Sequence, residues 1–242
     1  ADSKAILNVL IYHGNPKQST KTVGFAKLPS EMTTNTKYHI QAQSQSVPDD
    51  YRVTDSNPKD YYDVEKAVEY ARTYALKRNP DYPAFENNCT NFVSQCLAAG
   101  GISMTGKETI SNTKRLKVSK KSTDWYSVSK QDSKKIKHYG TSSAFINTDD
   151  FLKYFQEELG YTLSTFDNTY EGKLKCYQTM ASGDVVVLYD SDGSIAHIGL
   201  ISGMGDMNAY YCANTNDRLD YGVFNINSTM YPRFGILHMS KQ

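Results

Sequence analysis

The spacing of the apolar residues changes along the chain, and this change constrains the fold more than any other feature. Between residues 61 and 99 apolar residues recur at intervals of three and four, which is typical of helices with one buried face. Between residues 184 and 240 short β-branched and aromatic runs alternate with turn residues, which predicts an antiparallel sheet. Helices followed by an antiparallel sheet indicate an α+β fold.

Turn and capping residues place the expected elements. The first helix starts near Asp63, a good N-cap, and must end by the NPDYP segment at 79–83. The second covers CTNFVSQCLAA at 89–99 and ends at Gly100 and Gly101. A third is expected over 148–159, with Thr148 as its cap. Strands are expected at 184–190, 194–202, 208–215, 222–227 and 233–240, and the polar, Lys-rich residues 102–147 are expected to form a long surface loop.

The N-terminal residues are interpreted as a separate region. Strand-like runs at 6–12, 21–28 and 37–43 precede a polar, linker-like segment. We therefore predict an N-terminal extension or small β-rich accessory region at 1–56 and a catalytic domain at 57–242.

The overall composition excludes several classes of function. The 27 basic residues nearly balance the 26 acidic ones, so the net charge of +1 does not favour nucleic acid. No apolar run approaches the roughly 20 residues that a membrane span requires, so we expect no membrane insertion. The four cysteines contain no CxxC pair, and we expect neither a metal nor another cofactor. The polar composition, with 19 Tyr and a mean hydropathy of −0.58, leads us to expect a secreted protein of the extracellular space or cell wall.

Cys89 is the candidate nucleophile. It opens the second helix, where unpaired backbone N–H groups and the helix dipole favour a thiolate. Asn88, just before it, can cap the helix, and the backbone N–H of Cys89 could hold an oxyanion. The alternative role is packing, which we assign to Cys96 because it lies on the apolar stripe of the same helix.

His197 is the candidate general base among the five histidines. Alternation places it on one strand face with Ile195, Gly199 and Ile201, and Gly199 leaves room there for the cysteine helix. The alternative is a structural histidine, which is how we interpret His238 near the end of the last strand.

A third polar group would orient the imidazole of the base. Asn214 is the preferred candidate, because alternation in NAYYCANTND places it on one face with Tyr210 and Cys212. Asn216 and Asp217 remain alternatives.

Several further residues are candidates for substrate contacts. Asn88, Tyr82 and Trp125 are predicted to bind substrate, with Tyr82 or Asn88 near the oxyanion; local packing is the alternative for the aromatic residues. The Lys-rich stretches at 114–121 and 130–137 could meet an anionic wall polymer, although such runs are usually solvated faces.

The residues also resemble a known family. The segments YDVEKAVEYARTYALKRNPDYPAFENNCTNFVSQCLAAGG, GDVVVLYDSDGSIAHIGLIS and NTND are similar to the putative amidase domain family of Gram-positive bacteria, over residues 61 to 235. That family belongs with papain-like cell-wall hydrolases such as CHAP amidases. The resemblance implies a papain-like fold, a nucleophile at Cys89, a base at His197 and a polar third residue at the start of NTND. The family often has His where this chain has Asn214, and usually Asp where it has Asn88.

The expected activity is hydrolysis of amide bonds in peptidoglycan or another peptide substrate through a thioester acyl-enzyme. One alternative is an acyltransferase or transpeptidase that uses the same Cys–His pair. Another is a non-catalytic module that binds the cell wall.

Overall fold

The computed structural model describes residues 62–205 and 207–239 of the 242-residue chain. The strand-like runs predicted within residues 1–56, and the domain boundary predicted at residue 56, lie outside these residues and stay predictions.

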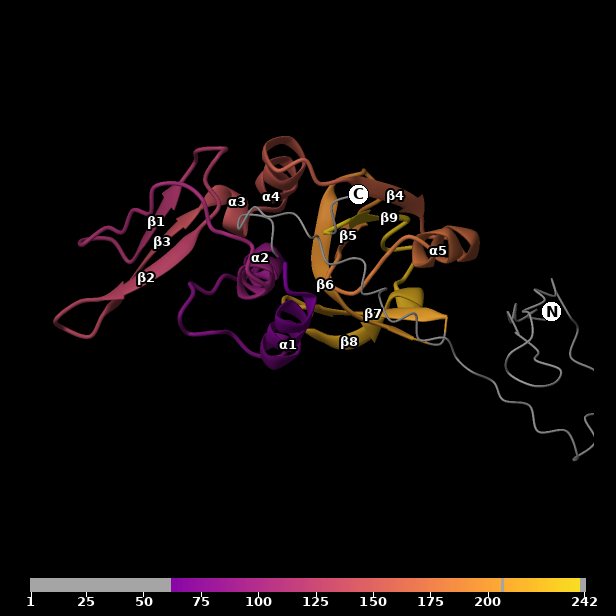
Figure 1. The fold of residues 1–242 in the computed structure, drawn as a ribbon, viewed down its shortest axis with the longest axis horizontal. Helices are drawn as coiled ribbons and strands as arrows, with labels where there is room; N and C mark the ends of the chain where they lie inside the picture. The colour runs from indigo at the N-terminus through magenta and orange to yellow at the C-terminus, as the bar shows by residue number, and fades with distance from the viewer. Residues whose placement is uncertain (1–61, 206, 240–242) are drawn as a thin grey trace, which may run out of the picture. The chain divides into compact units, whose positions relative to one another are not determined.

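A six-stranded antiparallel sheet forms the C-terminal part of the fold (Figure 1). Its strand order is β4-β9-β5-β6-β7-β8. The strands are β4 (Leu163–Asp167), β5 (Val185–Tyr189), β6 (Ile195–Gly205), β7 (Asn208–Ala213), β8 (Arg218–Gly222) and β9 (Arg233–Leu237). The predicted α+β class and antiparallel sheet are therefore confirmed.

The two predicted N-terminal helices are present. They are α1 (Val64–Tyr74) and α2 (Cys89–Ala99). The Asp63 side chain caps α1 by accepting the Lys66 backbone N–H at 3.1 Å, as predicted. Beyond α2, Gly101 adopts a φ of 94°, which glycine tolerates without the steric cost of a Cβ.

Both faces of the six-stranded sheet are buried. Successive side chains of β5 point to opposite faces, so they show what covers each one. Val185 and Val187 belong to a core cluster that also holds the buried residues of α1 and α2, and we call this side the helix face. Val186 and Leu188 belong to a second cluster that includes Cys176 of α5 (Tyr170–Tyr177), and we call this side the α5 face. Figure 1 shows α1 and α2 on one side of the sheet and α5 on the other.

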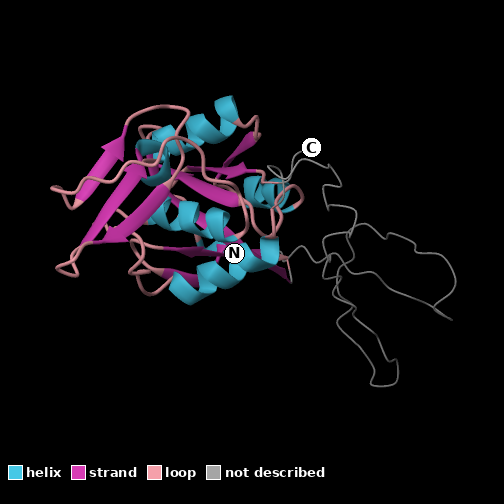
Figure 2. Ribbon diagram, turned by 60° about the vertical axis from the view of Figure 1, so that its left-hand side comes forward, coloured by secondary structure: helices cyan, strands magenta, loops and turns pink. Residues whose placement is uncertain are grey.

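Residues 102–147 do not form the predicted surface loop. They contain a three-stranded sheet of β1 (Leu116–Ser119), β2 (Ser127–Gln131) and β3 (Lys137–Ser142), followed by α3 (Ser143–Ile146) (Figure 2). In this insert sheet β1 pairs with β3 in parallel and β2 pairs with β3 antiparallel. β1 and β2 are short and rich in Lys and Ser, so their alternation is weak, and the large buried side chains Trp125 and Tyr126 lie between these two strands in the sequence.

Three further boundaries differ from the prediction. The strand expected at 222–227 is wrong: β8 ends at Gly222, and Val223–Asn225 forms a 3₁₀ turn. In this turn Asn208 Oδ1 accepts the Phe224 N–H at 3.2 Å.

Strand β4 and helix α5 were not predicted. The third helix starts as expected with α4 (Thr148–Lys153), but its cap is Asn147, and it continues as the π-helical turn η2 (Tyr154–Glu158).

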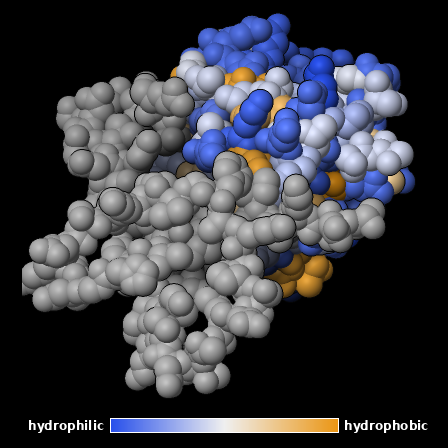
Figure 3. Space-filling model, turned by 90° about the vertical axis from the view of Figure 1, so that its right-hand side faces the viewer, coloured by the Kyte–Doolittle hydropathy of each residue, from blue (hydrophilic) through white to orange (hydrophobic). Residues whose placement is uncertain are grey.

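The surface is predominantly polar where it can be seen in Figure 3, with scattered apolar residues. Single exposed apolar side chains of this kind are normal on protein surfaces. Within the described residues, no helix is both long enough and apolar enough to span a bilayer.

Candidate active site

Cys89 is the first residue of α2, as predicted, and its side chain is 8% exposed. The first turn of α2 contains no acidic residue that would oppose a negative charge on the sulfur. The Thr90 hydroxyl lies 3.9 Å from the Cys89 sulfur and 2.7 Å from the Thr148 hydroxyl. Cys89 therefore lies at the N-terminus of α2, where the first backbone N–H groups of a helix have no partner within the helix.

The other three cysteines are fully buried, and all four are free thiols. Burial is the main reason that the pKa of Cys96, of Cys176 and of Cys212 is raised. Cys96 packs in the core on the helix face, as the sequence predicted. These three thiols are therefore structural, and Cys89 is the most exposed of the four.

Asn88 occupies the N-cap position of α2, but its side chain makes no capping hydrogen bond to the helix backbone and bonds other segments instead. Its Nδ2 donates to Asn214 Oδ1 at 2.8 Å, and its backbone N–H donates to Thr215 Oγ1 at 2.7 Å. Its Oδ1 accepts from Asn91 Nδ2 at 2.9 Å and from the Phe85 N–H at 3.2 Å. The turn after β7 is thus hydrogen-bonded to the residue that precedes Cys89.

Asn214 links that turn to α1 as well. Its Nδ2 donates to the backbone oxygens of Tyr74 at 3.0 Å and Ala75 at 2.8 Å, and the residue is 2% exposed. Of the two rival candidates, Asn216 is exposed and Asp217 forms an ion pair with Arg78 at 3.0 Å. Asn214 is therefore the candidate tied to the start of α2, although none of its described hydrogen bonds joins it to His197.

His197 lies on the α5 face of the sheet. It pairs with Leu188 across the strands, and residues directly opposite each other share a face. A Cβ on Gly199, two residues on, would meet the Tyr211 ring at 2.6 Å, and Tyr211 belongs to the same cluster. Burial, with a smaller contribution from the positive charge of Arg218, lowers the pKa of His197 to about 4.

The cysteine helix does not pack on the face that carries Gly199 and His197, so this part of the sequence prediction is wrong. Tyr211 fills the room that Gly199 leaves, and α2 packs against Ile198 and Leu200 instead. The Nε2 atom of His197 is buried and has no hydrogen-bond partner among the described residues. The structure thus joins the start of α2 to Asn214 and leaves the imidazole on the opposite face.

Residues 61–233 match the family described as "Putative amidase domain". The chain belongs to this family. Membership supports hydrolysis of amide bonds in general.

Two curated proteins of Bacillus subtilis (strain 168) are similar to this amidase domain. The first, named "Uncharacterized protein YhbB", is 58% identical over 45 residues, which are 19% of this chain and 14% of that protein. The second, named "Uncharacterized protein YjcM", is 24% identical over 203 residues, which are 80% of this chain and 42% of that protein. The chain therefore spans less than half the length of either relative. No solved structure matches the chain.

The two aromatic residues predicted to bind substrate have different positions in the amidase domain. Trp125 is fully buried, its Nε1 donates to Ser94 Oγ at 3.2 Å, and it packs against Phe145 with ring centres 5.1 Å apart. Its predicted place in a substrate cleft is therefore wrong. Tyr82 is half-buried and stacks on Phe145 with ring centres 6.0 Å apart, and burial raises its pKa. Its substrate-binding role stays a prediction.

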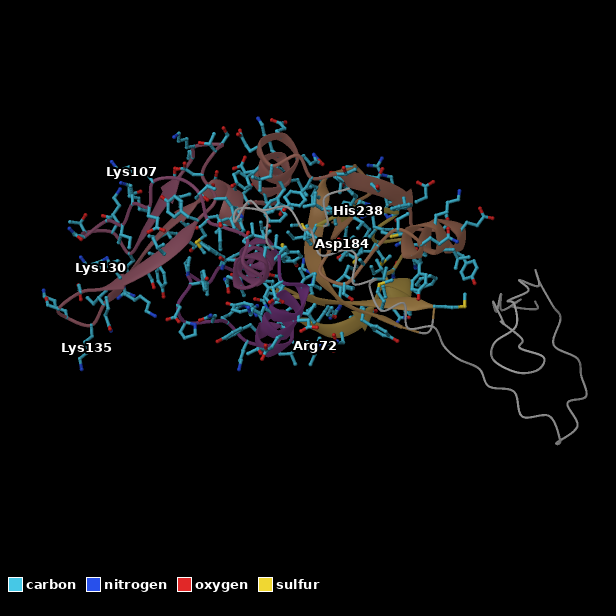
Figure 4. All side chains as sticks on the ribbon, in the orientation of Figure 1. Arg72, Lys107, Lys130, Lys135, Asp184 and His238 are labelled. Atoms are coloured by element: carbon cyan, nitrogen blue, oxygen red, sulfur yellow. The ribbon has the colours of Figure 1, made fainter. Side chains whose placement is uncertain are left out.

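The amidase domain also contains a Ser–His–Asp arrangement that the sequence did not indicate. His238 Nε2 lies 3.0 Å from Ser164 Oγ. Its Nδ1 lies 3.5 Å from Asp184 Oδ2, and Figure 4 labels His238 and Asp184. The Asp184 carboxylate also accepts the backbone N–H groups of Ala181 and Met239, both at 2.8 Å. The carboxylate thus holds the chain after β9 to the turn before β5, which agrees with the structural role predicted for His238.

The described residues contain no group of three or more His, Cys, Asp or Glu side chains that could hold a metal ion.

Proposed function

We propose that this domain is a cysteine hydrolase that acts outside the cell and cleaves amide bonds of peptidoglycan. The observation that carries the proposal is the position of Cys89 at the start of α2, in a chain that belongs to an amidase family. A backbone N–H at this helix end can hold the oxyanion that forms when a nucleophile attacks an amide carbonyl.

The proposed reaction has two steps. The Cys89 thiolate attacks the amide carbon, a C–S bond forms, the C–N bond breaks, and the amine leaves with a proton from the protonated base. Water then attacks the thioester, releases the carboxylic acid and returns the thiol. The Asn88–Asn214 hydrogen bond supports this site by fixing the turn from which α2 starts.

His197 is the proposed base, and burial on the α5 face lowers its pKa to about 4, so the imidazole is neutral near pH 7 in this conformation. The proposal requires the imidazole to reach the helix face. A β-bulge interrupts the β5–β6 register between Leu188 and Tyr189, beside His197. A shift by one residue at such a site turns a side chain to the other face of the sheet, so we propose this shift for the active state.

The test is digestion of purified peptidoglycan by the wild type and by Cys89→Ala, with mass spectrometry of the released fragments. We expect the variant to lose activity by at least about a thousandfold, because it lacks the nucleophile. A matched control is Cys96→Val, which changes a buried thiol outside the site and should retain activity. New ends that form equally with wild type and Cys89→Ala would overturn the mechanism.

The products identify the bond and the type of reaction. A free lactyl group on the sugar indicates a muramoyl-alanine amidase, whereas a cut within the stem or cross-bridge indicates an endopeptidase. Products that carry an added amine would indicate acyl transfer instead of hydrolysis.

One observation favours a second candidate, a non-catalytic module that binds the cell wall. The imidazole of His197 lies across the sheet from α2 in the described conformation. For such a module, wild type and Cys89→Ala would sediment equally with peptidoglycan, and neither would release fragments.

A further inference from the structure

Positive charge is concentrated in the insert sheet and the loops around it. Residues 104–142 hold ten basic and only three acidic residues, whereas the whole chain has a net charge of +1. The ten basic residues are Lys107, Lys114, Arg115, Lys117, Lys120, Lys121, Lys130, Lys134, Lys135 and Lys137. The remainder of the chain is correspondingly acidic, so the charge is distributed unevenly.

Local carboxylates do not neutralise this charge. Within the described residues, Lys137 is the one member of the set with an ion pair, to Asp81 at 2.9 Å. The other nine are exposed, and we call them the basic surface. Two of the three acidic residues have other partners: Asp124 is buried and accepts from Ser119 Oγ at 2.7 Å, and Asp132 interacts with His138 at 3.3 Å.

The strand register gives the insert sheet two different faces. Lys137 and Tyr139 lie opposite Gln131 and Ser129, and both reach the backbone oxygen of Pro80, at 2.8 Å and 3.2 Å. This face is therefore tied to the segment between α1 and α2.

The other face carries part of the basic surface. Lys117 lies opposite Gly140, and Lys130 lies opposite His138, which places both lysines on the face turned away from Pro80. Lys130 and His138 also line a pocket of about 290 Å³. Figure 4 shows Lys107, Lys130 and Lys135 spread over the insert sheet, far from the six-stranded sheet.

The chemistry of this surface narrows the choice of partner. Eight of its nine cations are lysines, which bind phosphate as point charges without the bidentate geometry of arginine. The insert offers no exposed aromatic ring among its described residues on which a base could stack: Trp125 and Tyr126 are fully buried, and Tyr139 is only partly exposed. Val118 is its one exposed large apolar side chain, too little to anchor the surface in a bilayer.

We propose that the basic surface of the insert sheet binds a linear polyanion without bases, such as a chain of phosphate groups. Binding rests on charge spread over many lysines and on the release of counterions from the polymer. This inference goes beyond the proposed amide hydrolysis, because it needs neither Cys89 nor His197.

The experiment measures binding of the full chain to long-chain inorganic polyphosphate by titration calorimetry at several salt concentrations. The test variant is Lys117→Gln/Lys130→Gln/Lys135→Gln. The matched control is Lys77→Gln/Lys153→Gln/Lys175→Gln, which removes the same charge from exposed positions outside the insert.

We expect the test variant to bind polyphosphate at least about tenfold more weakly, and the control to change Kd by less than about twofold. The slope of log Kd against log salt should become shallower in the test variant alone, since fewer counterions are released. Circular dichroism should show that both variants are folded, because all six lysines are exposed.

Three results would overturn the proposal. Equal losses in both variants would show that net charge alone drives binding. Tighter binding to oligothymidylate of matched charge would assign the surface to nucleic acid. Binding to anionic vesicles without binding to polyphosphate would assign it to a membrane.

Discussion

Asn214 uses its amide to join three parts of the chain. Its oxygen accepts from Asn88, before α2, and its nitrogen donates to Tyr74 and Ala75, at the end of α1. The sequence predicted that Asn214 orients the imidazole of His197, and its described hydrogen bonds reach Asn88 and the end of α1 instead. The sequence could not indicate these partners, because they depend on how α1 ends and on how the turn after β7 folds.

We expect Asn214→Ala to lower the free energy of unfolding by about 2 to 4 kcal/mol, because it leaves buried polar groups at both helix ends without partners. Urea denaturation measures this loss. The control is Asn216→Gly, at an exposed position with a φ of 52°, which should change stability by less than about 0.5 kcal/mol. Equal small effects in the two variants would contradict the structural role of Asn214.

His197 should make stability depend on pH. Its pKa is about 4 in the folded state and near 6.5 in the unfolded chain, so the unfolded state binds the proton first as the pH falls. Stability is therefore retained above about pH 6.5 and lost between pH 6.5 and 4, by up to roughly 3 kcal/mol for this group. Urea unfolding at several pH values should show this loss in the wild type and less of it in His197→Gln.

His138 should change the pH dependence of stability in the direction opposite to His197. A backbone oxygen and Asp132 raise its pKa, so its protonated form contributes stability that is present at low pH and is lost as the pH rises through that pKa. We expect His138→Gln to lose stability at acid pH more steeply than the wild type. A pH profile that is the same in wild type and His197→Gln would show that the buried imidazole does not control it.

At the level of elements, helices and strands with a strong apolar repeat were predicted correctly, whereas the short polar strands of the insert sheet were not. α1, α2 and most of the C-terminal strands have strong apolar periodicity, and the structure confirms them. The insert sheet lacks that signal, because its strands are polar and its apolar contacts come from Trp125 and from other elements. The face of β6 that α2 covers could not be predicted either, because it depends on a bulge and on where Tyr211 packs.

Gly140 tests how closely residues 107–112 pack on the insert sheet. A Cβ at Gly140 would lie 2.2 Å from the Thr109 backbone oxygen, so one of the two segments must move. We expect Gly140→Ala to lower the free energy of unfolding by about 1 to 3 kcal/mol, as overpacking does. The matched control is Gly203→Ala, whose nearest neighbour would be Arg72 at 3.5 Å and which should be nearly neutral. Equal effects in denaturant titrations would contradict the close approach.

At the scale of the whole molecule, the candidate active site and the basic surface lie on different elements. The start of α2, with Cys89, lies against the six-stranded sheet, and the basic surface lies on the insert sheet. The two sheets have separate hydrogen-bond ladders, and α3 follows β3 directly and packs against α2. The sequence indicated both, through Cys89 at the start of a helix and through the Lys-rich stretches at 114–121 and 130–137, and the strand register places Lys117 and Lys130 on one face of the insert sheet.

Trp125 lies where the insert packs against α2, α3 and η2. It packs against Phe145 of α3 and against Tyr154 and Phe155 of η2, and its indole bonds Ser94 of α2. It is also the one tryptophan of the sequence. Its fluorescence is therefore an internal probe of this junction: loosening of the insert from the helices would shift the emission to longer wavelength, even while the six-stranded sheet remained folded.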